Sequence, residues 1–227
     1  PSPGAVRPPS SFVDIPPADP VFDFSRDGVL RSFDESLARL GVDRLDIVHV
    51  HDPDAHEAEA LSTAFPALVE LREQGVIGKV GCGMNQVAML ARFVERVDLD
   101  CILLAGRFTL LDRSGAALLA QCAARGVEVI AGGVFNSGLL ATPVAGATFD
   151  YAAAPAELVA RAQRLQAVCD GFGVPLPAAA LQFVSRHPSV TRTLVGARSA
   201  AEIEADVAYA DLAIDPSLWG ALDAALA

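Results

Sequence analysis

Short apolar runs alternate with helical stretches five times along this chain of 227 residues, and this alternation limits the possible folds more than any other feature. Each apolar run is a few residues long and ends in a glycine-rich or polar turn, which is typical of strands buried on both faces. A helical stretch follows each run, so the sequence predicts a parallel sheet with helices outside it. The strands are expected at about 45–51, 76–82, 101–105, 127–131 and 191–195.

The helices are predicted from apolar residues that recur every three or four positions and from residues that favour helix ends. Ser25 and Gly41 mark the ends of the first helix, and residues 1–24 before it are rich in proline and predict an irregular segment. The long irregular stretch 141–155 follows a strand, which makes it a candidate lid. The other helices are expected at about 57–74, 86–96, 114–125, 155–171, 176–186, from Ser199 onward and at 216–226.

Residues 25–227 show no domain break, so we expect one domain. Two architectures agree with the alternation of strands and helices. One is a doubly wound open sheet, and the other is a (β/α)8 barrel of which the chain supplies five units. An open sheet that binds a dinucleotide carries a glycine fingerprint after its first strand. The sequence His51-Asp-Pro-Asp54 stands at that place, so a Rossmann-type site is not expected there.

Composition narrows the range of partners and compartments. The formal net charge of −11 argues against nucleic acid and anionic membranes as partners, and no apolar stretch reaches the roughly 18 residues of a membrane span. No signal peptide is recognisable. The four cysteines have neither disulfide-framework nor zinc-site spacing, which predicts buried reduced thiols, no metal site and a cytoplasmic protein: Cys82, Cys101, Cys122 and Cys169.

The residues that follow the strands are expected at one edge of the sheet, where α/β proteins bind ligands. The first strand ends at His51 and Asp52. These two residues either take part in ligand binding and catalysis, or are polar residues whose hydrogen bonds are satisfied within a turn. Glycine-rich turns and one helix N-terminus follow later strands, and together they favour a phosphate-bearing ligand. These segments are 81–86, 106–109, 132–138 and 196–199.

At these residues the chain resembles the aldo/keto reductases, closest to their branch of L-fucose dehydrogenase and D-threo-aldose 1-dehydrogenase. The resemblance spans residues 21–227 and implies a (β/α)8 TIM barrel, an α/β fold, of which only about five βα units are present. Residues 25–227 would be the C-terminal part of that barrel. The similar motifs, in order, are 25–54, Gly83-Met-Asn-Gln86, 103–112, Val134-Phe-Asn-Ser-Gly138, 181–188 and Val195-Gly-Ala-Arg-Ser199.

The resemblance implies a site for NAD or NADP and for a sugar or aldehyde. His51 matches the catalytic histidine that orients the substrate carbonyl, and Asp52 and Arg107 are substrate-binding candidates. Ala105 and Gly132 replace a glutamine and a tyrosine that many members use at the nicotinamide, and Phe135 is a candidate replacement for the tyrosine's ring. The residues implied to bind the cofactor are Met84, Asn85, Gly132, Gly133, Phe135, Ser137, Gly196, Arg198, Ser199, Glu202 and Asp206.

The choice between the two cofactors is expected to depend on Glu202 and Asp206. They stand where several reductases have an arginine and an asparagine. Two carboxylates repel a 2′-phosphate and accept hydrogen bonds from a ribose hydroxyl, although Arg198 nearby partly offsets their charge. The sequence therefore favours NAD over NADP.

The family's catalytic aspartate, tyrosine and lysine have no match in the chain. In family members they precede the region that corresponds to residue 20, and neither Lys79 nor Tyr209 takes their place. Five strands cannot close a barrel, so we expect this to be the C-terminal portion of a longer dehydrogenase, or else a remnant that covers its edges as a homo-oligomer. The alternatives to an oxidoreductase are a non-catalytic nucleotide-binding or interaction protein and a barrel hydrolase or lyase that uses His51 and Asp52.

Overall fold

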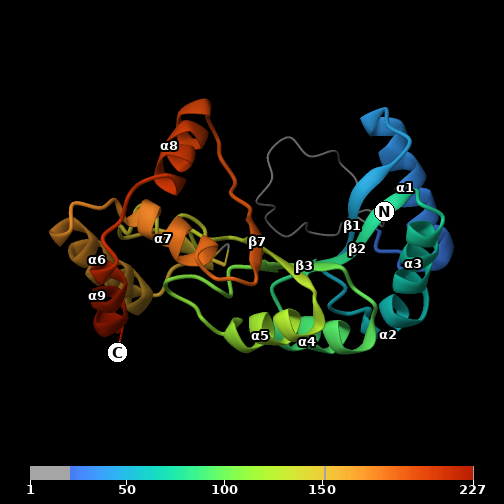
Figure 1. The fold of residues 1–227 in the computed structure, drawn as a ribbon, viewed down its shortest axis with the longest axis horizontal. Helices are drawn as coiled ribbons and strands as arrows, with labels where there is room; N and C mark the ends of the chain where they lie inside the picture. Colours follow the sequence, from blue (N-terminus) through green and yellow to red (C-terminus); the bar gives the residue numbers. More distant parts are fainter. Residues whose placement is uncertain (1–20, 151, 227) are drawn as a thin grey trace, which may run out of the picture.

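The described residues form one parallel sheet flanked by helices (Figure 1). The structure is a computed structural model that describes residues 21–150 and 152–226. Most of the segment 1–24, predicted to be irregular, lies outside these residues, and its last four residues belong to no helix or strand.

The sheet contains the five expected strands, all parallel and in the order β1-β2-β3-β4-β7. Strands β1 and β7 form its two edges, and no described strand pairs with their outer sides. The barrel is therefore not closed within the described residues, which agrees with the predicted partial barrel. The strands are β1 (Leu45–His51), β2 (Ile77–Met84), β3 (Cys101–Ala105), β4 (Glu128–Gly132) and β7 (Val190–Thr193).

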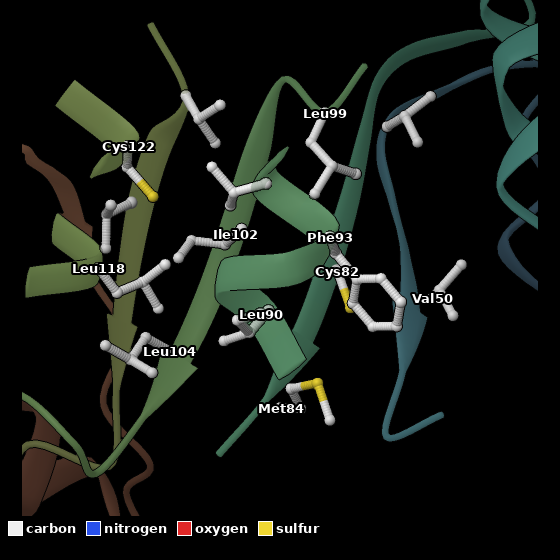
Figure 2. Packing of buried hydrophobic residues seen from close by; sticks show 14 of the residues in the cluster. Val50, Cys82, Met84, Leu90, Phe93, Leu99, Ile102, Leu104, Leu118 and Cys122 are labelled. Atoms are coloured by element: carbon white, nitrogen blue, oxygen red, sulfur yellow. The ribbon is translucent and has the colours of Figure 1, made fainter. Parts of the chain in front are cut away.

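Helices α4 (Val87–Arg96) and α5 (Ala116–Arg125) cover one face of the sheet, below it in Figure 1. Figure 2 shows how their apolar side chains meet alternate residues of the strands. Cys82 and Met84 point from β2 toward α4, where Leu90 and Phe93 are completely buried. Alternation along the strand leaves Gly81 and Gly83 of β2 on the opposite, inner face.

Helix α1 (Arg26–Leu40) has the predicted ends. The Ser25 hydroxyl accepts a hydrogen bond from the Gly28 amide at 3.1 Å, and Gly41 adopts a left-handed φ of 68° that ends the helix. Only glycine reaches this conformation without steric strain, so Gly41 stops the helix sharply and turns the chain into β1.

The prediction of a single helix at 57–74 is wrong in one respect, because a π-helical turn interrupts the helix. The segment consists of α2 (Glu57–Glu59), η1 (Ala60–Ala64) and α3 (Phe65–Glu73). Pro66 has no amide hydrogen to continue the α-helical ladder. The Thr63 hydroxyl lies 2.7 Å from the carbonyl oxygens of both Glu59 and Phe24, which ties the widened turn to the segment before α1.

The C-terminal helices form a second apolar cluster beside the sheet. They are α6 (Ala156–Gly171), α7 (Leu176–Ser185) and α9 (Ser217–Leu226). Helix α8 (Ala200–Ala210) has no fully buried residue and meets this cluster through Tyr209. No single described helix has the length and apolarity of a bilayer span; α6 and α7 meet that test only as a pair, across a bend of 97°.

Two further boundaries differ from the expectation. Strand β7 ends at Thr193 rather than at residue 195. The Leu194 amide makes the last backbone hydrogen bond to β4, to the Ala131 carbonyl at 2.8 Å, and the chain then leaves the sheet toward α8. The irregular stretch 141–155 contains a small hairpin of β5 (Thr148–Phe149) and β6 (Ala152–Ala153).

The prediction of buried thiols is confirmed. All four cysteines are free and buried. Burial raises the pKa of Cys82 to about 12 and those of the other three to about 11, so the thiols stay protonated near neutral pH.

Candidate functional site

The carboxyl edge of the sheet brings together the turns that the sequence singled out. Register places His51 beside Gly83 and Ala105 beside Gly132. The inner face is therefore lined at this level by glycine and alanine, and it leaves room above the strands for a ligand to approach the backbone.

His51 lies at the end of β1 and its side chain is 77% exposed. Its Nδ1 atom lies 3.4 Å from the Asp52 carboxylate, and the Asp52 amide donates to the Gly83 carbonyl at 3.0 Å. Asp52 has a left-handed φ of 44°, which turns the chain sharply out of the sheet. The imidazole therefore projects from the carboxyl edge, and the neighbouring carboxylate can orient it.

The turn after β4 is held in an unusual conformation. Gly133, Asn136, Ser137 and Gly138 all have positive φ values, from 47° to 92°. The Asn136 side chain is 3% exposed, and its Nδ2 atom donates to the Gly106 carbonyl at 3.3 Å. This contact fastens the turn after β4 to the turn after β3, while the Asn136 Oδ1 atom has no partner among the described residues.

Six of the residues predicted to bind the cofactor line one cleft of about 500 Å³. The cleft lies between the turn after β4, the start of α7 and one side of α8. Pro177, Thr142 and Tyr209 also line it, although the sequence did not single them out for this role. The six residues are Phe135, Ser137, Gly196, Arg198, Glu202 and Asp206.

Arg198 and Glu202 form an ion pair at the N-terminus of α8. The Glu202 carboxylate accepts a hydrogen bond from the Arg198 amide at 2.7 Å and one from its guanidinium at 3.0 Å. The Ser199 hydroxyl caps the helix by accepting from the Glu202 amide at 3.2 Å. Ser199 therefore holds the helix end, and the charge of Arg198 is already matched by a carboxylate.

Burial and the charge of Glu202 raise the pKa of the Asp206 carboxyl. Hydrogen bonds from Arg198 lower the pKa of Glu202. The two carboxylates lie on the same side of α8, one turn apart, so the cleft carries negative charge along this helix.

Arg107 forms a bidentate ion pair with Asp150 rather than standing free for a substrate. Its two terminal nitrogens lie 3.0 and 2.7 Å from the Asp150 carboxylate, while Asp112 lies 3.7 Å away. The pair raises the pKa of Arg107 and fixes the tip of the β5–β6 hairpin beside the end of β3. The sequence offered no signal for this contact, because 43 residues separate the partners.

Other predicted residues are placed differently. Met84 is 2% exposed and packs into the core behind the sheet, so a cofactor could meet only its backbone, whereas Asn85 is half-buried at the end of β2. Gly132 ends β4 and Gly133 begins the turn after it, and neither lines the cleft. His51 borders a different cavity, of about 360 Å³, between β1 and α1. Among the described residues, no group of His, Cys, Asp and Glu side chains has the arrangement of a metal site.

The fold and this edge define an α/β protein built on part of a (β/α)8 barrel, with glycine-rich and polar turns at the carboxyl ends of its strands. Comparison with known proteins assigns the family: the model of the aldo/keto reductase family matches residues 15–227, and the chain belongs to that family.

Curated relatives support the same assignment. The chain is 44% identical over 214 residues to pyridoxal 4-dehydrogenase of Microbacterium luteolum, a match that covers 89% of the chain and 63% of the relative. It is 40% identical over 205 residues to D-threo-aldose 1-dehydrogenase of a Pseudomonas species, covering 88% and 62%. The chain thus spans somewhat less than two thirds of the length of these two relatives.

A solved structure shows the same fold. The holo form of aldo-keto reductase AKR11C1 from Bacillus halodurans superposes with a TM-score of 0.72 at 23% identity, covering 86% of the chain and 65% of that protein.

Proposed function

We propose that this chain is the cofactor-binding part of a nicotinamide-dependent aldose 1-dehydrogenase, an oxidoreductase of the aldo/keto reductase family. The observation that carries the proposal is the α8 cleft, which is lined by six residues expected from the sequence to bind the cofactor. Family membership and the name of the D-threo-aldose 1-dehydrogenase relative support the reaction class.

The size and the lining of the cleft support a nucleotide ligand. Its volume of about 500 Å³ lies within the range of small-molecule sites. The turn after β4 forms one wall of the cleft, and the amides of Asn136 and Gly138 are already used in hydrogen bonds within the turn, so this wall is rigid. Glu202 and Asp206 supply oxygen acceptors for ribose hydroxyls.

The proposed reaction is the oxidation of the C1 hydroxyl of a cyclic aldose, such as L-fucose or a related sugar. Hydride leaves C1, the hydroxyl proton leaves to a base, and C1 becomes the carbonyl of a lactone. Nicotinamide, when bound, supplies the hydride acceptor. His51 orients the sugar by hydrogen bonding to the oxygen on C1, because its exposed imidazole stands at the carboxyl edge and is held by Asp52.

The described residues hold no counterpart of the family's tyrosine and lysine acid/base pair. Lys79 lies within β2 and pairs with Glu128 at 2.5 Å, and Tyr209 lies on α8. We therefore expect negligible turnover from the 227 residues alone. A measured oxidation of L-fucose by this chain would overturn that expectation without affecting the cofactor site.

NAD is proposed as the preferred cofactor. The Glu202 carboxylate accepts one hydrogen bond from the Arg198 guanidinium and one from the Arg198 backbone amide, so it competes with a 2′-phosphate for the arginine. Asp206 adds a second carboxylate on the same side of α8, and both carboxylates repel the phosphate.

Titration of the chain with NADH and with NADPH, followed by nucleotide fluorescence, tests the proposal. NADH is expected to bind more tightly, and Glu202→Gln is expected to shift the ratio of the two dissociation constants toward NADPH by about fivefold. Glu204→Gln, which removes a charge from the exposed side of the same helix, is the matched control. Tenfold tighter binding of NADPH by the unaltered chain would contradict the NAD preference.

The competing candidate is a non-catalytic nucleotide-binding protein derived from the same family, favoured by the absence of an acid/base pair from the described residues. Both candidates bind NADH. An activity assay of the native protein from its source distinguishes them. Turnover of an aldose with NAD supports the dehydrogenase, and binding without turnover supports the alternative. The four buried, unpaired thiols are consistent with the reducing conditions of the cytoplasm, the compartment we propose.

A further inference from the structure

The side of α8 that faces the cleft ends in an aromatic residue to which sequence analysis gave no role. Glu202, Asp206 and Tyr209 lie four and three residues apart, which places them on one side of a helix. All three are partly buried and line the cleft, whereas Ile203, on another side of the helix, is 43% exposed. One side of α8 therefore runs from two carboxylates to a phenol ring.

Tyr209 is held in place by contacts on the side away from the cleft. Its side chain packs against both apolar clusters, at the place where the sheet core meets the C-terminal helices. The Gln182 amide donates to the Tyr209 carbonyl at 2.7 Å and also to that of Leu212 at 2.7 Å. The Tyr209 hydroxyl has no hydrogen-bond partner among the described residues, so the ring is anchored while its polar end stays available.

The other walls of the cleft near this ring are small or uncharged. Gly138, Ala141 and Thr142 come from the chain after β4, and Pro177 comes from the first turn of α7. Such walls suit a flat, largely apolar group rather than a phosphate or a sugar. Of the charged residues in the cleft, Arg198 and Glu202 lie near the start of α8 and bind each other, and Asp206 lies three residues before the ring.

We propose that Tyr209 positions the adenine base of the dinucleotide by stacking its ring against the base. A purine offers an aromatic face for stacking and an exocyclic amine that can donate to a carboxylate such as that of Asp206. This inference rests on the proposed function, because it assumes that a nicotinamide dinucleotide occupies the cleft. It adds to that function the residue that recognises the base.

The test compares Tyr209→Ala with Tyr209→Phe in the 227-residue chain. Binding of NADH and of AMP is measured by titration, together with nicotinamide mononucleotide, which lacks the adenine. Stacking predicts that Y209F binds within about twofold of the unaltered chain, while Y209A binds both NADH and AMP roughly tenfold more weakly. Affinity for nicotinamide mononucleotide is expected to stay the same in all three.

Proton resonances of AMP provide a readout that a purely structural role for Tyr209 would not move. The adenine protons are expected to shift upfield on binding to the unaltered chain and to Y209F, because they enter the ring current of residue 209, and not to shift on binding to Y209A. Phe172→Ala, which removes a 41% exposed aromatic side chain outside the cleft, is the control. Thermal unfolding of each variant checks that the fold is retained.

The outcomes separate this inference from the proposed function. If the unaltered chain binds neither NADH nor AMP, both fail. If it binds NADH and Y209A binds equally well, or if the adenine protons shift alike in Y209A, the role of Tyr209 is refuted and the cofactor site stands.

Discussion

Arg107 and Asp150 form a bidentate ion pair that joins the carboxyl end of β3 to the tip of the β5–β6 hairpin. The base of the same hairpin is held by Thr148, whose hydroxyl donates to the Ser137 carbonyl at 3.0 Å. The hairpin thus reaches from the α8 cleft, which Ser137 lines, to the carboxyl end of β3. The stretch predicted as a lid is therefore tied to the rest of the structure through Thr148 and Asp150.

Removing the ion pair is expected to loosen the hairpin with little effect on global stability. Asp150→Asn keeps a residue that tolerates the left-handed φ of 48°. The side chains of Arg107 and Asp150 are 18% and 43% exposed, so solvent screens the pair and its loss is expected to cost less than about 1 kcal/mol. Faster hydrogen exchange of residues 147–153 in D150N is the expected measurement.

The control for the hairpin is Glu70→Gln, which removes an equally short ion pair to Arg26 between α1 and α3. It should leave exchange in the hairpin unchanged. Exchange rates in D150N equal to those of the unaltered chain would show that other contacts hold the hairpin.

His49 is expected to make stability depend on pH. Burial, followed by the nearby His51, lowers the pKa of His49 below its usual 6.5 in the folded state. The unfolded chain therefore binds more protons just below pH 6.5, and stability is fully present above that pH and declines as pH falls below it. The slope can reach about 1.4 kcal/mol per pH unit. Urea unfolding of His49→Gln between pH 5 and 7.5 should show a flatter profile than the unaltered chain, and parallel profiles would exclude this role.

Gly81 is expected to tolerate no side chain, because β2 passes directly beneath the His49 ring. A Cβ atom at residue 81 would lie within 3.0 Å of both His49 and the Cys101 sulfur. Overpacking of this kind costs about 1–3 kcal/mol, so Gly81→Ala should lower the free energy of unfolding by that amount. Gly220→Ala in α9, where nothing lies within 4 Å, should instead be neutral or stabilising. Adding His49→Ala to G81A should restore part of the loss.

Asn136 should be replaced more easily by glycine than by alanine. Asn136→Ala combines the loss of the hydrogen bond to Gly106 with the strain of a left-handed φ of 47°, whereas Asn136→Gly loses only the bond. The two variants are expected to differ in unfolding free energy by about 1 kcal/mol, with N136A the less stable. Equal stabilities in denaturant titrations would show that the turn adapts its conformation.

Much of this fold was readable from local sequence. The five strands, their parallel direction and the order of helices follow from apolar runs, helical periodicity and residues such as Ser25 and Gly41, because strand burial and helix capping depend on neighbours close in the chain. The same reasoning placed His51 at a strand end, and the resemblance to a family directed attention to the residues that line the α8 cleft.

The prediction for Met84 shows where local reading fell short. The motif placed it with the cofactor residues, yet Met84 shares the alternation of Cys82 and points into the core behind β2. The period of two along a strand could have indicated this orientation. The interruption of the helix at 60–64 depends on Thr63 reaching the Phe24 carbonyl, a contact across 39 residues that no local pattern encodes.

The sequence by itself determined which segments become strands and helices and which turns gather at the ligand edge, because those choices depend on periodicity, glycine and caps within a few residues. Only the tertiary structure decided that Asp150 forms an ion pair with Arg107, that Glu202 forms one with Arg198, and that Tyr209 borders the cleft. The charge and shape of a site depend on which side chains meet in space, and folding brings such partners together from distant parts of the chain.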